Sequence, residues 1–352
     1  MTVPTATIPT QAGTGPSLAD TAPKVLSLLA GYVGHRTVSI GLRTGLVRTL
    51  ADRPGSTADD LADACELDPF YVSVWCRAAM AASLTEPEGA GYRLGDHMAT
   101  LLLDTGSPAY AGGVFGVLEA PEVFGRFEEA FASGERMWWD DTSHEWIAAV
   151  TGTGTPFYTR LIPGGLGRVP GVAEALAAGC RVVDTACGTG IGLLRLATTY
   201  PNCTIVGVDG DQHSIDRARD RLAGAGLVDR VELICSALED MELDAPARVV
   251  VNNISMHECR DIDRVTENVR AALEPGGTFV ISDFPFPDTD EALRSVPGRI
   301  MTGIQFFEAQ IDDQLLPRAA YDDLLTRHGF TDLGSVQLTP MHAVTYGRRP
   351  QG

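Results

Sequence analysis

The stretch VVDTACGTGIG, residues 182–192, constrains the fold more strongly than any other part of the sequence. A β-type run ends at Asp184, a glycine-rich loop follows, and a helical pattern begins near Leu193. Glycines let a backbone adopt positive φ and approach a ligand closely, and the free N–H groups of a helix N-terminus suit a carboxylate or a phosphate. The three glycines are not spaced as GxGxxG, so the stretch does not match the dinucleotide fingerprint. We expect a ligand-binding turn here; an ordinary tight strand–helix turn is the alternative.

The second half of the chain alternates apolar β-type runs with helical patterns from residue 171 onward. This rhythm is typical of a mostly parallel sheet covered by helices. The last two runs lie close together around Pro340, so we expect them to pair antiparallel at one edge. The predicted fold class is α/β with a Rossmann-like, doubly wound sheet. The expected strands cover residues 181–184, 204–209, 231–236, 248–253, 278–283, 331–338 and 342–346.

Asp209 stands at the end of the second expected strand, which closes with IVGVD. In a doubly wound sheet this position faces the ribose of a bound nucleoside, where a carboxylate can accept from both hydroxyls. A lone aspartate at a strand end often only caps the next helix. The glycine loop and Asp209 support each other, and together they indicate a ligand that contains a nucleoside.

The first third of the chain is predicted to be mostly helical, after a flexible tail over residues 1–17 that is rich in Thr, Pro and Gly. A capping box at residues 56–61 opens one short helix, and Asp68 followed by Pro69 opens a second. A turn and the run YRL at residues 92–94 complete a small hairpin. This order of elements is the outline of a winged helix.

The winged-helix outline allows two interpretations, DNA binding or a scaffold for dimerisation. The second helix would read DNA, yet it offers Arg77 as its only cation for phosphate contacts. The chain has 27 Lys and Arg against 46 Asp and Glu, a formal net charge of −19 that repels phosphate backbones and anionic lipids. We therefore favour dimerisation and expect neither a nucleic acid nor a membrane partner.

The cysteines and the apolar runs bear on where the protein works. Seven cysteines, an odd number without a CxxC pair, are typical of reduced thiols in the cytosol. No uninterrupted run approaches the ~18 apolar residues of a membrane span, and the N-terminus lacks the features of a signal peptide. These observations predict a soluble, cytoplasmic protein.

The sequence resembles the class I S-adenosylmethionine (SAM) dependent methyltransferases. The motifs that carry the resemblance are VVDTACGTG at residues 182–190, VGVDGD at 206–211 and EPGG at 274–277. The helix DPFYVSVWCRAAMAASL and the following GYRL also resemble the winged-helix dimerisation domain of small-molecule methyltransferases. The resemblance implies a SAM cofactor, a small-molecule acceptor and a homodimer. It divides the chain into a tail at 1–17, a winged-helix domain at 18–110, linking helices that cover the substrate pocket at 111–170, and a SAM-binding domain at 171–352.

The resemblance also assigns cofactor contacts by position. Asp184, Gly188 and Gly190 would surround the methionine part of SAM, and Asp209 would hold its ribose. Ser236 and Ala237, at the end of the third expected strand, would lie by the adenine. Many relatives have an aspartate where this chain has Ala237. They also have a glycine where this chain has Ala186, whose extra methyl group would narrow the turn after the first expected strand. The residues assigned to the cofactor are Asp184, Gly188, Gly190, Asp209, Ser236, Ala237 and Asn253.

His257 is the candidate catalytic residue. It lies where plant-type O-methyltransferases have their catalytic histidine, within an HD pattern that here reads HE. A histidine with a pKa of about 6.5 is a base near neutrality, and removing a proton from a hydroxyl can contribute roughly 10²–10⁴-fold to a rate. A structural role, capping a helix or filling the core, is the alternative. We expect no metal at His257, Glu258 and Cys259, because three consecutive residues point in different directions on a helix or a strand.

Aromatic residues are candidates for an apolar acceptor pocket. The predicted acceptor is a bulky, partly aromatic molecule of specialised metabolism, methylated on oxygen. Methylation of carbon or nitrogen on an electron-rich ring fits the same scaffold. A SAM- or DNA-binding regulator, or an enzyme that uses SAM only for its charge, are further alternatives. The pocket candidates are Trp138, Trp139, Tyr158, Met256, Phe306 and Phe307, with Phe157 beside Tyr158.

Overall fold

The computed structural model describes residues 15–137 and 139–351. Contacts within the chain divide it into two compact units, residues 1–96 and 97–352. The first unit therefore ends before the domain boundary predicted near residue 110. Most of the predicted tail lies outside the described residues, and the first helix begins directly after it, at Leu18.

The first unit is the winged helix that the sequence predicts. The capping box is present at Thr57, whose side chain accepts from the N–H of Asp60, and Asp68 accepts from the N–H of Tyr71. Its helices pack against the two-stranded antiparallel wing. Its elements are α1 (Leu18–Arg43), α2 (Leu46–Asp52), α3 (Ala58–Cys65), α4 (Pro69–Ala81), β1 (Thr85–Glu88) and β2 (Gly91–Leu94).

Helix α1 presents an extended apolar surface. By length and composition alone it is apolar enough to cross a membrane. Only 17% of its most apolar segment is buried within the protein. This helix contains no long uninterrupted apolar run, because Gly, Ser and His interrupt its apolar residues. The exposed apolar side chains of α1 include Leu18, Val25, Leu26, Leu28, Leu29, Tyr32 and Val33.

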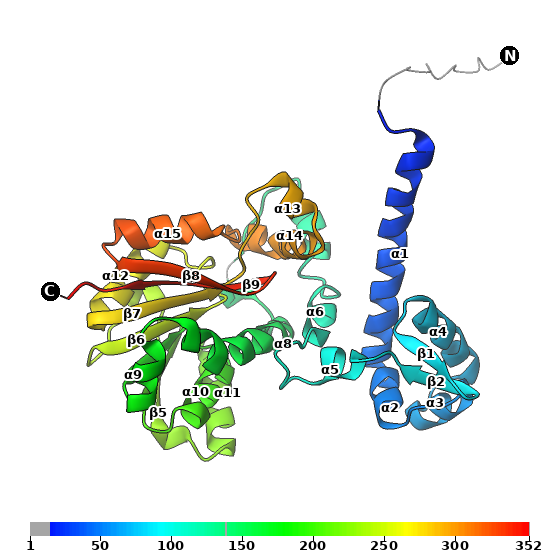
Figure 1. Cartoon of the computed structure of the whole chain (residues 1–352), viewed down its shortest axis with the longest axis horizontal. Helices are drawn as coiled ribbons and strands as arrows, with labels where there is room; N and C mark the ends of the chain where they lie inside the picture. Colours follow the sequence, from blue (N-terminus) through cyan, green and yellow to red (C-terminus); the bar gives the residue numbers. More distant parts are fainter. Residues whose placement is uncertain (1–14, 138, 352) are drawn as a thin grey trace. The chain divides into compact units, whose positions relative to one another are not determined.

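The second unit is a mixed seven-stranded sheet with helices on both faces (Figure 1). Its strand order is β5-β4-β3-β6-β7-β9-β8, and all neighbours are parallel except β7·β9 and β9·β8. The predicted antiparallel edge pair is thus confirmed. The strands are β3 (Arg181–Thr185), β4 (Thr204–Asp209), β5 (Val231–Cys235), β6 (Ala247–Asn253), β7 (Leu273–Asp283), β8 (Thr331–Thr339) and β9 (His342–Arg348).

Helices precede the sheet and connect its strands. The segment before β3 contains α5 (Met98–Leu103), α6 (Gly112–Val117), α7 (Gly125–Ala130), the single turn Trp139–Asp141, α8 (His144–Arg160), short turns over Leu161–Arg168 and α9 (Val172–Ala178). The later helices are α10 (Ile191–Thr199), α11 (Gln212–Gly224), α12 (Ile262–Ala272), α13 (Asp290–Arg294), α14 (Val296–Glu308) and α15 (Arg318–Arg327).

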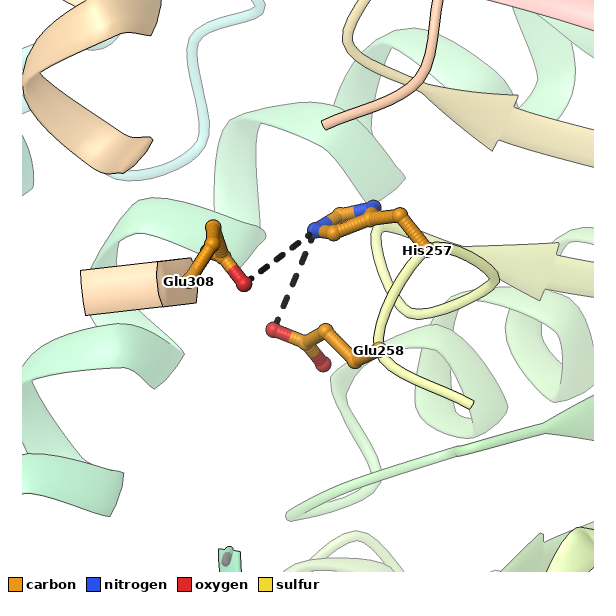
Figure 2. Close-up of side chains that lie close together, drawn as sticks. All are labelled: His257, Glu258 and Glu308. Carbon is orange, nitrogen blue, oxygen red and sulfur yellow. Dashed lines mark ion pairs between the residues drawn. The ribbon is translucent and has the colours of Figure 1, made fainter. Parts of the chain in front are cut away.

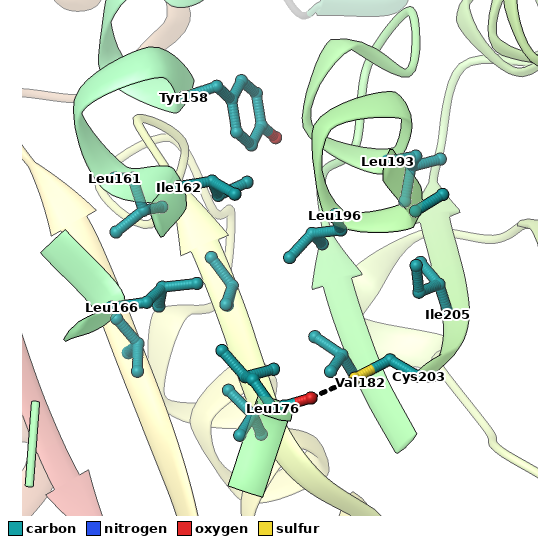
Figure 3. Packing of buried hydrophobic residues seen from close by; sticks show 14 of the residues in the cluster. Tyr158, Leu161, Ile162, Leu166, Leu176, Val182, Leu193, Leu196, Cys203 and Ile205 are labelled. Carbon is teal, nitrogen blue, oxygen red and sulfur yellow. Dashed lines mark hydrogen bonds between the residues drawn. The ribbon is translucent and has the colours of Figure 1, made fainter. Parts of the chain in front are cut away.

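Two apolar layers cover the two faces of the sheet. On one face, side chains such as Val182 and Ile205 pack against α8–α11, and Figure 3 shows Leu161, Leu193 and Leu196 converging there. On the other face, alternate strand residues pack against α12 and α15. Because successive strand side chains point to opposite faces, both layers are built from the same strands.

The strand order positions the site. From β3 the chain goes to β4 on one side, and β6 lies on the other side of β3. Such a reversal leaves a crevice outside the carboxyl ends of the strands, where ligands bind in open α/β sheets. The loop after β3, Asp209 at the end of β4 and Asn253 at the end of β6 therefore come together at one edge.

Candidate functional site

A cavity of about 370 Å³ lies at these carboxyl ends, within the ~300–1,000 Å³ typical of small-molecule sites. Its floor comes from the loop after β3 and the ends of β4 and β6, and α8 supplies a largely apolar wall. The lining includes residues 186–189, 209–211, 237–239, 253–255 and 258–260, together with Trp139, Ile147, Val150, Thr151, Gly154, Tyr158, Ile191, Ser214, Ile311 and Asp313.

The glycine loop after β3 has positive φ angles, and at Gly190 it lies too close to α11 for a side chain. Gly190 has φ +79°, and a Cβ there would lie 2.8 Å from the Cβ of Ala218. Gly188 has φ +51° and lines the cavity. Ala186 also has a positive φ of 59°, which costs a non-glycine residue about 1–2 kcal/mol. The alanine therefore places backbone strain in the loop as well as an extra methyl group.

Asp209 is fixed by the loop that it faces. Its carboxylate accepts from the N–H of Gly188 at 2.8 Å and from the N–H of Asp211 at 3.0 Å. Burial raises its pKa, and these two hydrogen bonds act in the opposite direction. An ionised carboxylate has about four acceptor positions, so positions remain for the two hydroxyls of a ribose.

Asp184 lies deeper than the cavity wall. It is fully buried, and one of its oxygens accepts from the Tyr158 hydroxyl at 3.1 Å. Its Oδ2 has no hydrogen-bond partner among the described residues. Burial raises its pKa to about 8. A Cβ at Gly192 would lie 2.1 Å from the Tyr158 ring, so this glycine allows the tyrosine to reach Asp184.

The end of β5 supplies the last part of the predicted cofactor set. Ala237 lines the cavity beside Gly210, whereas Ser236 is half-buried and donates its N–H to the carbonyl of Asp209. Three residues of the predicted cofactor set, Asp184, Gly190 and Ser236, are therefore not among those that line the cavity.

His257 lies in a cluster of carboxylates behind the cavity wall. Its Nδ1 is 2.8 Å from Asp283, which also accepts from the Tyr321 hydroxyl at 2.6 Å. Figure 2 shows the other nitrogen, Nε2, directed at two more carboxylates: Glu308 at 3.8 Å and Glu258 at 3.9 Å. Only 2% of the His257 side chain is exposed, and it is Glu258 that lines the cavity.

The charges of this cluster determine which groups hold protons. Burial lowers the pKa of His257, but Asp283 and Glu308 outweigh it and raise that pKa well above 6.5. Burial and the charge of Glu308 raise the pKa of Glu258 well above its usual value. The same two causes raise the pKa of Asp313 to about 7. Of this cluster, Asp313 is therefore the group whose pKa lies near neutral pH.

Two domain families match this chain. Residues 182–277 match the model described as a methyltransferase domain, and residues 33–103 match an Rv2258c-like winged HTH domain. The chain carries a class I SAM-dependent methyltransferase domain. The glycine loop and the free acceptor positions of Asp209 fit this cofactor.

Relatives of known identity share the domain or the fold. The 27-O-demethylrifamycin SV methyltransferase of Amycolatopsis mediterranei (strain S699) is 30% identical over 168 residues, which are 47% of this chain and 59% of that protein. The mitomycin 7-O-methyltransferase MmcR has a TM-score of 0.71 at 17% identity, over 94% of this chain and 98% of its own. Human N-acetylserotonin methyltransferase, in complex with SAM, has a TM-score of 0.70 at 15% identity, over 96% and 99%.

The methyltransferase domain contains one group that has the geometry of a cation site. Ligand atoms of His257, Glu258 and Glu308 all lie within 4.8 Å of one another. The expectation that His257 and Glu258 point apart is wrong, because they lie in a turn rather than on a helix or strand. Cys259 is not part of the group, and its thiol donates to the carbonyl of Ser255.

The predicted aromatic pocket is only partly assembled. Trp139 and Tyr158 line the cavity of the methyltransferase domain. Met256 is fully buried in the apolar layer next to α12, and Phe306 packs against Phe124 and Phe127. Trp138 lies outside the described residues. Phe307 packs against Trp146 and Trp139, and Phe157 against Phe284 and His342, so neither lines the cavity.

Sequence reasoning missed the acidic partners of His257. Asp283 ends the fifth parallel strand and Glu308 ends α14, so both are distant from His257 in the chain. The only local signal was the position of Asp283 at a strand end, which is where site residues of such sheets gather. The sequence pattern does not single out Glu308, because the apolar periodicity of α14 is that of any helix packed on a core.

Proposed function

We propose that this protein transfers the methyl group of SAM to an oxygen of a small, partly aromatic metabolite. The observation that carries the proposal is the continuity of the cavity. One space is lined by Gly188 and Asp209 at the cofactor end, and by Glu258 and Asp313 at the other. One relative is a methyltransferase of 27-O-demethylrifamycin SV and the other a mitomycin 7-O-methyltransferase, and both support oxygen as the acceptor and specialised metabolism as the setting.

SAM supplies a methyl group on a positively charged sulfonium. The domain's residues would hold and align it: Asp209 would accept from the ribose, and Ala237 and Gly210 would border the adenine. Much of the rate would come from this alignment, because oriented reactants avoid a large entropic barrier. The apolar side chains of α8, Ile147 and Val150, exclude water from the transfer path.

The acceptor proton leaves toward Glu258 and His257. Glu258 lines the cavity, and only 15% of its side chain is exposed, so it is the group that meets the acceptor hydroxyl. His257 lies 3.9 Å behind it, a separation that can shorten when substrate binds. Asp283 orients the ring through Nδ1 and stabilises its charged form. In this scheme the Glu258–His257 pair accepts the proton of the hydroxyl only after it has lost one of its own protons to solvent, and this form becomes more populated as pH rises because both pKa values are raised.

Methyl transfer from labelled SAM to a panel of phenols and other hydroxylated aromatics tests the proposal. We expect a labelled product and S-adenosylhomocysteine (SAH) in equal amounts, with the new methyl group on oxygen by NMR of the product. No transfer to any acceptor by protein that binds SAM would contradict the enzymatic proposal. Product without SAH would instead indicate a reaction in which SAM is not the methyl donor.

The acidic acceptor end also favours a second candidate, methylation of an amine. Glu258 and Asp313 would attract a protonated amine, which a neutral phenol does not exploit. Including aromatic amines in the same panel separates the two, since product NMR places the new methyl group on nitrogen or oxygen. Preference for amines at saturating SAM would replace oxygen in the proposal.

We propose further that two copies associate through the winged-helix unit. Contiguous exposed apolar side chains mark interaction surfaces, and α1 carries an extended row of such side chains. Phe70 and Tyr71 of α4 are also exposed. Light scattering should give twice the 37.4 kDa chain mass at micromolar concentration. A monomer mass for wild type would contradict this assignment.

We propose a cytoplasmic location from the state of the thiols. All seven cysteines are free in the structure, and Cys180 and Cys203, although neighbours, form no disulfide. Seven alkylatable thiols in protein purified without reductant would support this placement. Disulfides in freshly isolated protein would argue against it.

A further inference from the structure

A buried chain of hydrogen bonds runs from α8 through the sheet to the cavity wall. Arg160 Nε is 3.0 Å from His342 Nδ1, and His342 Nε2 is 2.8 Å from the Ser282 hydroxyl. The Ser282 hydroxyl is in turn 2.7 Å from Asn253 Oδ1. Asn253 and Ser282 are direct neighbours across β6 and β7.

The arginine fixes the direction of every hydrogen bond in the chain. A guanidinium only donates, so His342 Nδ1 must accept and carries no proton. The neutral ring then has its proton on Nε2 and donates it to the Ser282 oxygen. Burial and the charge of Arg160 lower the pKa of His342 well below 6.5, so the ring stays neutral over the working range of pH.

The direction continues into the amide of Asn253. Ser282 is fully buried, and its hydroxyl already accepts from His342, so its own proton needs an acceptor. Asn253 Oδ1 is that acceptor. With the amide flipped, the Ser282 oxygen would face two donors and its proton would have no acceptor, which costs about 1–3 kcal/mol. The amide nitrogen of Asn253 is therefore held on the side away from Ser282.

This nitrogen is a donor without an acceptor. Only 3% of Asn253 is exposed, the residue lines the cavity, and its Nδ2 has no hydrogen-bond partner among the described residues. Since Ser282 and Asp283 are consecutive on β7, their side chains point to opposite faces of the sheet. Asn253, which contacts Ser282, thus lies on one face of the sheet, and His257, which contacts Asp283, lies on the opposite face.

We propose that Asn253 Nδ2 donates to the carboxylate of the methionine part of SAM, and that Arg160, His342 and Ser282 are the residues that orient it. The neighbouring strand β3 supplies a complementary group on the same face, the unpartnered Oδ2 of Asp184. An amino-acid head group carries both a carboxylate and an ammonium, which match one amide donor and one carboxyl oxygen that accepts. This assignment rests on the proposed function, because it requires SAM in the cavity.

The test compares two ligands that differ only in the carboxylate: SAH and S-adenosyl-3-thiopropylamine. Calorimetry with wild-type protein should show SAH binding at least tenfold more tightly. Asn253→Asp replaces the donor with an anion of the same shape, so SAH affinity should fall at least tenfold while the amine analogue binds as well as before or better. Equal weakening of both ligands, or no change in either, would overturn the assignment.

Ser282 provides a second test with less risk to folding. Ser282→Ala frees the amide to rotate, so the preference for SAH over the analogue should fall about threefold or more, and Ser282→Thr should restore it because it retains the hydroxyl. An unchanged preference in Ser282→Ala would show that the chain does not orient Asn253. These readouts are affinities, so they stand apart from the proposed methyl transfer: wild type that binds neither ligand contradicts the cofactor site itself.

Discussion

Two buried histidines of the methyltransferase domain contact consecutive residues of strand β7 and have opposite charge behaviour. Asp283 contacts His257, and Ser282 contacts His342 on the other face of the sheet. Burial lowers the pKa of both rings. Near His257 the carboxylates Asp283 and Glu308 reverse that effect, whereas near His342 the charge of Arg160 adds to it.

The difference teaches that burial alone does not decide what a histidine does. A ring among carboxylates is held charged and can exchange protons, and a ring against an arginine is held neutral and can only transmit a direction of hydrogen bonding. We assign proton transfer to the His257 region and cofactor orientation to the His342 region. Each prediction below tests one side of this division.

The largest expected effect is on turnover. His257→Ala and Glu258→Gln should each lower kcat by about 100-fold or more, since general base catalysis contributes roughly 10²–10⁴-fold, and leave the Kd for SAH within about twofold. Glu242→Gln, at an exposed position outside the cavity, is the matched control for Glu258→Gln. Unchanged turnover in His257→Ala would remove this residue from the mechanism.

The next effect concerns pH. His257 has a raised pKa, so it is protonated at neutral pH and becomes a base only as pH rises; kcat/KM should therefore increase with pH through an inflection above 6.5. Asp283→Asn removes a charge that favours the protonated ring, which should move this inflection to lower pH. A rate that falls over the same pH range, or an inflection unmoved by Asp283→Asn, would show that another group controls the rate.

A smaller effect is expected on the other side of the strand. Arg160→Met removes both the donor and the positive charge next to His342, so the pKa of His342 should rise and SAH affinity should fall about threefold. Histidine resonances followed by NMR from pH 4 to 8 report the first change, and calorimetry reports the second. The inflection of kcat/KM assigned to His257 should stay in place; if it moves, the two regions are not separate.

The smallest expected effect is that of a chelator. His257, Glu258 and Glu308 have the geometry of a cation site, yet a charged imidazole compensates the same carboxylates. Incubation with EDTA followed by desalting should leave methyl transfer unchanged. Loss of activity that Mn²⁺ restores in wild type, and not in Glu308→Gln, would reassign His257 from proton transfer to metal binding.

The parts of the structure that depend on neighbours in sequence were predictable. The strand–loop–helix at residues 182–192, the capping residues Thr57 and Asp68, and the antiparallel edge pair are encoded by local patterns, and the structure has them where expected. The position of Asp209 opposite the glycine loop followed from the topology of a doubly wound sheet.

The parts that depend on long-range packing were not predictable. Asp283 meets His257 across 26 residues of sequence, and Arg160 meets His342 across 182. Aromatic residues such as Phe306 give the same sequence pattern whether they line a pocket or fill a core, and here Phe306 packs against other phenylalanines. The same applies to helix α1, because the sequence does not distinguish its exposed apolar side chains from the buried side chains of a core helix.

Calorimetric titration of SAH into wild type and Asp209→Ala tests the central claim most directly, that this cavity is a SAM site held by the glycine loop and Asp209. We predict micromolar binding that weakens at least tenfold, ~1.4 kcal/mol, in Asp209→Ala. Asp216→Ala on α11, an acidic residue outside the cavity lining, should bind as wild type does. No binding by nucleotide-free wild type, or equal affinity in wild type and Asp209→Ala, would contradict the account.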